Sequence, residues 1–330
     1  MYAHQDEWDV EEICYDDSHI DKVIEELRKN FDGYFEQFIE TEAGAGVSEQ
    51  AFKDLQKAFG TKTVTKRSAK NGSKAFKSII SNAYIKFEKD RQKYLDIFDT
   101  DMLEEYQDDP SYFKSQVLKI NCPIIIHATL FNRHAKELDK YRAQFSTAAP
   151  QELLSVVTVL CEFSSDYMKN VYDADTYEKI ETIDEMGLSP LDQDEGYTVY
   201  GVIGGGIKSH MLFKVHPSVF PNRSRSALWA LWFLTGKKSF GCKMDSEFLM
   251  IDVDKSIAQQ NYFYPYDLFA FYALELSGLL SEKAESMEAY IDPEYRYVIV
   301  DAFLNFVAKQ HQEETDLLKS QIRDGGMGYV

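Results

Sequence analysis

Apolar residues in the first half of the chain recur every three or four positions, the spacing of an amphipathic helix. The pattern predicts helices over residues 19–42, 47–60, 73–106, 123–145 and 150–171. Pro123 and Pro150 suit the first turn of the last two, because the amide proton that proline lacks has no partner in a first turn. The first half is therefore predicted to be a helical bundle.

The second half reads differently. An acidic stretch over residues 172–195, with Gly187 and Pro190, suggests a boundary, and we expect a mainly helical domain over 1–187 and a second domain over 188–330. Residues 197–216 are rich in alternating apolar positions, which predicts a β-hairpin, and 247–252 predicts a buried strand. Helices are expected over 226–235, 265–280 and 293–322. The predicted fold class is α+β and predominantly helical, with an N-terminal bundle followed by a small antiparallel sheet covered by helices.

The stretch YGVIGGGIKSH, residues 200–210, resembles a phosphate-binding loop in its glycines. A P-loop places its lysine directly after the last glycine and opens a helix, but here Ile207 separates Gly206 from Lys208. The following residues alternate like a strand. We therefore interpret the three glycines as the turn of the hairpin and reject the P-loop.

Composition narrows the setting. The net charge is −19, so general binding of nucleic acid over the whole surface is excluded, and an anion site needs locally gathered positive charge. The four cysteines contain no CxxC pair, which argues against a zinc knot and against a disulfide framework. An acidic N-terminus and short apolar runs predict a cytoplasmic protein with no membrane partner.

Two segments do gather positive charge. Residues 197–244 hold seven lysines and arginines and no acid, and residues 55–87 are also free of acid. The predicted phosphate-binding residues in these segments are Lys208, Lys214, Arg223, Arg225, Lys70, Lys74 and Lys77. The alternative is that these cations pair with the acidic arm at residues 6–21 or with the 172–195 stretch.

The run FLMIDVDKSI, residues 248–257, resembles the first motif of the haloacid dehalogenase family, hhhhDxDx[TS]. The resemblance implies that Asp252 is a nucleophile and Asp254 an acid/base, with Mg²⁺ between them. The remaining chain is short and mostly helical, unlike that family. A looser expectation is a Mg²⁺ or Mn²⁺ site that uses Asp252, Asp254 and His210, with His216 as a further catalytic residue.

Three functions follow from these patterns. The favoured one is binding of a phosphate-bearing ligand, nucleic acid or a nucleotide, through the basic segments. The enzyme alternative is a metal-dependent phosphoesterase or nuclease at the aspartate–histidine group. The third is a non-catalytic subunit or scaffold, whose basic segments meet a protein partner or a second copy of the chain.

Overall fold

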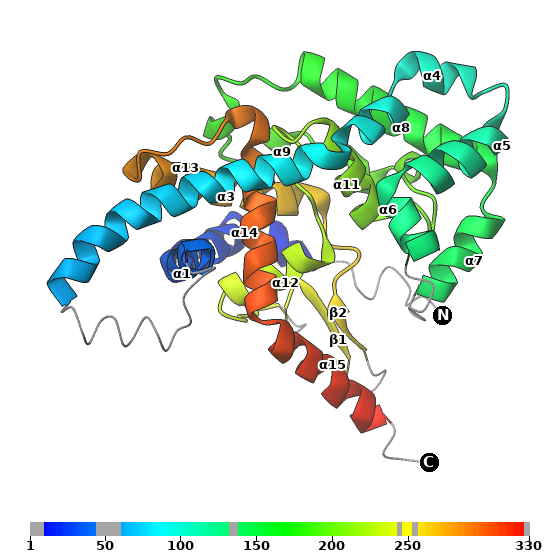
Figure 1. Ribbon diagram of the computed structural model, residues 1–330. Helices are drawn as coiled ribbons and strands as arrows, with labels where there is room; N and C mark the ends of the chain where they lie inside the picture. The colour runs from blue at the N-terminus through cyan, green and yellow to red at the C-terminus, as the bar shows by residue number, and fades with distance from the viewer. Residues whose placement is uncertain (1–9, 44–60, 132–137, 243–245, 253–256, 327–330) are drawn as a thin grey trace. The chain divides into compact units, whose positions relative to one another are not determined.

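The computed structural model describes residues 10–43, 61–131, 138–242, 246–252 and 257–326. Their secondary structure is predominantly helical, with a two-stranded antiparallel sheet, β1–β2, in the described part of the chain (Figure 1). The predicted α+β, mainly helical fold class is confirmed. The helix expected over 47–60 lies outside the described residues.

The elements follow one another along the chain with short connections. They are η2 (Glu12–Tyr15), α1 (Asp17–Ala43), α3 (Thr61–Ile97), α4 (Thr100–Glu105), α5 (Pro110–Tyr112), η3 (Phe113–Asn121), α6 (Pro123–Ile126), η4 (His127–Phe131), α7 (Asp139–Thr147), α8 (Pro150–Asn170), η6 (Tyr177–Lys179), α9 (Ile183–Met186), α10 (Pro190–Gln193), η7 (Glu195–Tyr197), α11 (Gly205–Val215), α12 (Arg225–Leu234), β1 (Leu249–Asp252), β2 (Ile257–Gln260), α13 (Tyr266–Ser286), η8 (Pro293–Tyr295), α14 (Arg296–Gln310) and α15 (Gln312–Gly326). No described helix is long and apolar enough to cross a bilayer.

Internal contacts divide the chain into two compact units. Unit 1 comprises Met1–Val10, Phe87–Arg225 and Tyr262–Leu274, and unit 2 comprises Glu11–Lys86, Ser226–Asn261 and Glu275–Val330. Each unit is therefore discontinuous in sequence. Unit 1 takes residues from both sides of position 187/188, and so does unit 2, whereas the predicted domain boundary at that position stays a prediction.

Unit 1 is organised around α8. Pro150 starts this helix, and its apolar face, which includes Leu153, Leu154, Val157 and Leu160, is buried. This face serves α4, α5, η3 and α11, all of which contact α8. Burying large aliphatic side chains stabilises such a helix by about 1.5–3 kcal/mol for each side chain. The predicted helix over 150–171 is confirmed.

Unit 2 joins the N-terminal helix to the C-terminal ones. Phe31 of α1 packs on Phe303 of α14, with ring centroids 5.3 Å apart, and Phe35 meets Phe76 edge to face at 5.1 Å. Strands β1 and β2 pair in antiparallel register from Leu249 with Gln260 to Asp252 with Ile257. The predicted strand over 247–252 is confirmed as β1, whose partner strand β2 contacts α15.

The predicted β-hairpin over residues 197–216 is wrong. Residues Gly205–Val215 form α11, and the preceding segment makes a single bridge between Val199 and Ile203. The physical reason is burial. A helix that is covered on nearly every side has no polar face, so its sequence loses the three-to-four spacing. The buried positions of α11 are Lys208, Ser209, Met211, Leu212, Phe213, Lys214 and Val215.

Candidate metal centre

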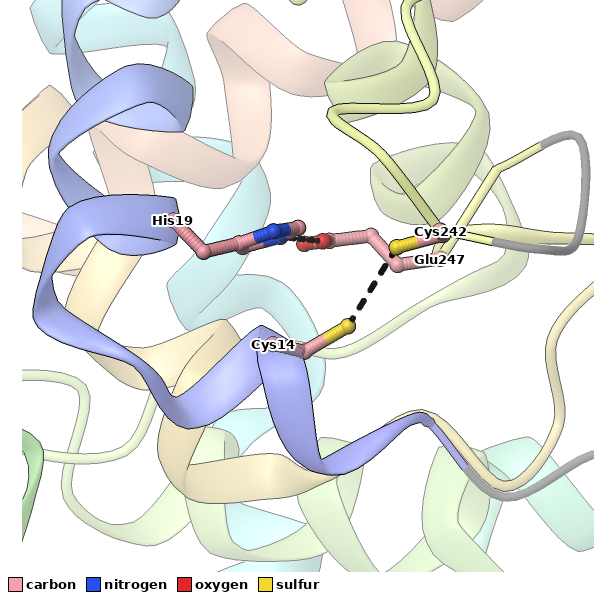
Figure 2. A group of neighbouring side chains, drawn as sticks. All are labelled: Cys14, His19, Cys242 and Glu247. Carbon is pink, nitrogen blue, oxygen red and sulfur yellow. Dashed lines mark hydrogen bonds and ion pairs between the residues drawn. The ribbon is translucent and has the colours of Figure 1, made fainter.

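Four side chains of unit 2 converge on one point: Cys14, His19, Cys242 and Glu247 (Figure 2). Cys14 belongs to η2, and His19 lies in the first turn of α1. Cys242 and Glu247 come from the connection between α12 and β1. Each segment supplies two donors with four residues between them, as C-x4-H and C-x4-E.

Local backbone structure fixes the first pair of donors. The amide of Cys14 donates to the carbonyl of Glu11 at 2.9 Å, which closes the 3-10 turn, and the amide of His19 donates to the carbonyl of Asp16 at 2.8 Å. The chain thus turns from η2 into α1 immediately after Cys14. This turn brings the Cys14 thiol and the His19 ring to the same side.

The second pair sits on a tightly turned connection. Phe240 and Gly241 have φ values of +52° and +94°, and the amide of Cys242 donates to the carbonyl of Ser239 at 2.9 Å. Positive φ is costly for a residue with a side chain, so Phe240 is held there by its surroundings. One such contact is its ring against His19, edge to face with centroids 5.8 Å apart. The carbonyl of Glu247 accepts from Asn261 at 3.2 Å, which ties the segment to the end of β2.

The distances between the donor atoms suit a tetrahedral ion. All four lie within 4.8 Å of one another, and the two sulfur atoms are 3.6 Å apart. Zinc–thiolate bonds of about 2.3 Å in tetrahedral geometry place two sulfurs about 3.8 Å apart. A disulfide would need about 2.05 Å, and both cysteines are free.

Burial makes these polar groups costly unless something neutralises them. Cys14 and His19 are each 1% exposed and Glu247 is 5% exposed, whereas Cys242 is half-buried. Burying a carboxylate requires a partner, and Nε2 of His19 contacts the Glu247 carboxylate. Nδ1 of His19 is buried without a hydrogen-bond partner among the described residues, so the polar contact of the ring runs through Nε2.

The ionisation of the group reflects this crowding. Burial lowers the pKa of His19, but the hydrogen bond and the charge of Glu247 outweigh it, so the pKa is raised. The hydrogen bond to Cys242, followed by burial, raises the pKa of the Cys14 thiol, and the same hydrogen bond lowers the pKa of Cys242. The two sulfurs therefore share one proton, which stays on Cys14.

The donor types select among metals. Thiolates and imidazole favour zinc and other borderline or soft ions, whereas Mg²⁺ and Ca²⁺ prefer oxygen ligands. Four protein donors, three of them buried, leave no open position, which is typical of a structural zinc site. This is the one group of three or more Cys, His, Asp or Glu side chains, within the described residues, whose spacing could hold an ion.

The predicted Mg²⁺ or Mn²⁺ ligands lie elsewhere. Asp252 ends β1 in unit 2, and Asp254 is outside the described residues. His210 lies within α11 and His216 caps its C-terminus, both in unit 1. Burial lowers the pKa of each of these histidines to about 4, with Lys214 adding to the effect at His210 and Arg91 at His216. The catalytic roles of Asp252, Asp254 and His216 stay predictions.

Two predicted phosphate-binding lysines point inward. Lys214 is 6% exposed, and its ammonium lies 2.6 Å from Asp90 and donates to the carbonyl of Phe87 at 3.0 Å. Lys208 is 4% exposed and lies 3.3 Å from Asp192. Both ammonium groups already have a carboxylate, so the separation of charge along the sequence is not a separation in space.

The other predicted cations differ among themselves. Arg223 is buried at 4% exposure, and Arg225 at the start of α12 is exposed. Lys74 and Lys77 are exposed on α3, and Lys70 lies on the same helix, but its side chain is outside the described part. Lys237 and Lys238, also in the basic segment, pair with Glu314 and Glu26.

Sequence reasoning missed the metal ligands because it searched for close cysteine pairs. The available signal was the repeated spacing, C-x4-H near the N-terminus and C-x4-E after α12, which becomes informative only when the two segments are known to meet. Comparison with protein-family models, with curated proteins and with solved structures finds no match to this chain. The argument for function therefore depends on the geometry.

Proposed function

We propose that this protein binds one divalent transition-metal ion, zinc by the chemistry of its donors, through Cys14, His19, Cys242 and Glu247. The observation that carries the proposal is the convergence of two thiols, an imidazole and a carboxylate, all within 4.8 Å of one another at a largely buried point. A sulfur–sulfur distance of 3.6 Å supports it, because that separation suits two ligands of one ion.

The role of the ion follows from where its ligands come from. It would bind the turn between η2 and α1 to the connection before β1, two segments at opposite ends of unit 2 in sequence. An ion that binds the folded state in this way adds its binding free energy to folding. The protein is then one whose unit 2 depends on metal for its stability.

Metal content and spectroscopy test the proposal. Protein purified without chelator should contain one zinc ion per chain by elemental mass spectrometry. Replacement by Co²⁺ should give the tetrahedral d–d bands and the sulfur-to-cobalt charge-transfer absorption of a two-thiolate site. Cys14→Ser and Cys242→Ser should remove most of the bound metal and weaken that charge-transfer band, because each removes one of the thiolates.

Cys161→Ser is the matched control. Cys161 lies in unit 1, and its thiol donates to the carbonyl of Phe98 at 3.1 Å, a bond that a hydroxyl can keep. This variant should retain full metal content. Substoichiometric metal in wild-type protein, or equal loss in all three variants, would contradict the proposal.

Binding of nucleic acid through the basic segments remains a prediction. The internal pairing of Lys208 and Lys214 leaves Arg225, Lys74 and Lys77 as the exposed cations of the original set. A gel-shift panel with DNA and RNA at increasing salt tests it, because phosphate contacts give strongly salt-dependent affinity.

A further inference from the structure

The glycine stretch acquires a second meaning once its helix is seen. Helix α11 starts at Gly205 after the cap residue Gly204, and the Gly204 carbonyl accepts from the amides of Ile207 and Lys208, both at 3.0 Å. The amides of Gly205 and Gly206 lie in the first turn, where no earlier carbonyl of the helix can accept from them. Helix α11 has 11 residues, so these amides carry the positive end of a full helix dipole.

A buried arginine is aimed at this end. Arg223 is 4% exposed, and its Nη1 is buried with no hydrogen-bond partner in the part of the chain that the structure describes. The guanidinium lies directly against the helix start: a methyl group added to Gly205 would meet Arg223 Nη2 at 1.4 Å. Glycine at this position is therefore what allows Arg223 to reach the first turn.

The neighbouring charges do not neutralise this arrangement. Lys208 lies one helical turn further on, and burial, with a contribution from the charge of Arg223, lowers its pKa. Asp192 is the carboxylate partner of Lys208, and its second oxygen accepts from the amide of Tyr266. The carboxylate of Asp192 is thus already bound on both oxygens.

A buried guanidinium beside the positive end of a helix costs several kcal/mol unless an anion compensates it. The same groups form a ready site for an anion, because arginine presents a planar fork of donors and the first turn presents free amides. We infer that the amides of Gly205 and Gly206, together with Arg223, bind a small tetrahedral oxyanion, the phosphate group of a small molecule.

Burial decides the size of the ligand. A polynucleotide backbone needs cations that reach the surface along a groove, whereas Arg223 is almost fully enclosed. A single phosphate group needs only one exposed approach and a few convergent donors. This inference is independent of the metal centre, which lies in unit 2, whereas all three residues of the oxyanion site lie in unit 1.

Glycine substitutions give a matched pair for the test. Gly205→Ala places its methyl group on the Arg223 guanidinium, the mobile end of a long side chain, and so displaces the cation. Gly206→Ala meets its nearest atom, the Arg223 carbonyl, at an ordinary 3.8 Å. The two variants change helix propensity alike, so a difference between them reports on the position of the guanidinium.

The experiment uses the full chain with its metal, in phosphate-free buffer of constant ionic strength. Inorganic phosphate, measured by calorimetry and by its effect on the thermal midpoint, should bind wild type and Gly206→Ala within twofold of each other. Gly205→Ala and Arg223→Met should weaken the dissociation constant at least tenfold. Arg223→Met, which removes the uncompensated charge, should fold and be as stable as wild type without phosphate.

Several outcomes would overturn the inference. One is the absence of phosphate binding to wild type, and another is equal binding to all four proteins. A third is a marked loss of stability in Arg223→Met without phosphate, which would mean that the guanidinium already has a stabilising role. Tight binding of a short oligonucleotide with no response to inorganic phosphate would replace the small ligand with nucleic acid.

Discussion

The metal centre of unit 2 and the start of α11 in unit 1 are both buried groups of ionisable side chains, and both carry a surplus of one kind. At Cys14, His19, Cys242 and Glu247 the surplus is of electron-pair donors. At Arg223 and Gly205 it is of hydrogen-bond donors and positive charge. The pair of Lys214 and Asp90 in unit 1 shows the balanced case, at 2.6 Å. A buried group is complete when its charges match, and a surplus indicates the chemistry of what it binds.

Removing the metal should have the largest effect of those we predict. An ion held a thousandfold above its dissociation constant stabilises the folded state by about 4 kcal/mol. Chelation, or Cys242→Ser, should therefore lower the thermal midpoint by roughly 10 °C. Differential scanning calorimetry before and after chelation, with zinc added back, measures the effect. An unchanged midpoint would remove the distinction between the metal centre and a self-contained group.

Breaking the balanced pair should come second. Asp90→Asn leaves the ammonium of Lys214 buried without its carboxylate, and the side chain of Asp90 is 34% exposed, so solvent softens the loss to about 2 kcal/mol. Lys214→Met combined with Asp90→Asn should cost less than the sum of the two single changes, because neither charge is then left alone. Urea unfolding of the four proteins gives the coupling energy. Simple additivity would show that the pair contributes nothing.

Acid should act next, through two histidines near the same pair. His210 and His216 have their pKa lowered from 6.5 to about 4, so the unfolded chain takes up protons that the folded protein refuses. Their contribution to stability is intact above the unfolded pKa and is lost as the pH falls from 6.5 towards 4. His216→Phe should reduce the drop in unfolding free energy between pH 7 and about pH 4.5 by roughly 2 kcal/mol, because one proton uptake is removed.

The groups that face these histidines define the control. Lys214 and Asp90 act on His210, and Arg91 acts on His216. Glu88→Gln, which removes the exposed partner that lies 2.8 Å from Arg91, should leave the pH dependence close to that of wild type. An equal flattening in Glu88→Gln and His216→Phe would assign the effect to carboxylates instead.

The smallest effect belongs to an exposed pair in unit 2. Lys238 contacts Glu26, which also lies 3.0 Å from Lys29, and the hydrogen bonds to Lys238 and Lys29 lower the pKa of Glu26. The Lys238 side chain is 49% exposed, so water screens the interaction. Lys238→Ala should change the unfolding free energy by less than about 0.5 kcal/mol in urea. A loss comparable to that of Asp90→Asn would mean that burial does not separate the two pairs.

Sequence patterns predicted the helices wherever a helix has one covered face and one wet face. The helix α8 was expected from residue 150 and runs over Pro150–Asn170, and the strand β1 was expected from its short apolar run. The pattern failed at α11, where burial on nearly all sides removed the polar face and left an alternation like that of a strand. The glycines were read as a turn for the same reason, although they begin a helix.

The candidate sites were harder to predict than the fold. Arg223 and Lys208 were selected from sequence for their charge, but the sequence could not show that Lys208 has Asp192 beside it and that Arg223 has no such partner. The four metal donors come from two segments far apart in the chain, and neither segment alone has enough ligands to suggest zinc.

Periodicity, turn residues and composition are local properties, and so the sequence by itself determined the mainly helical class, most of the helix positions and the absence of close cysteine pairs. Whether a charge is buried, which charge it meets and which donors converge depend on residues far apart in the chain. The tertiary structure alone therefore decided that Lys214 is neutralised by Asp90, that Arg223 lies against Gly205, and that Cys14 meets Cys242.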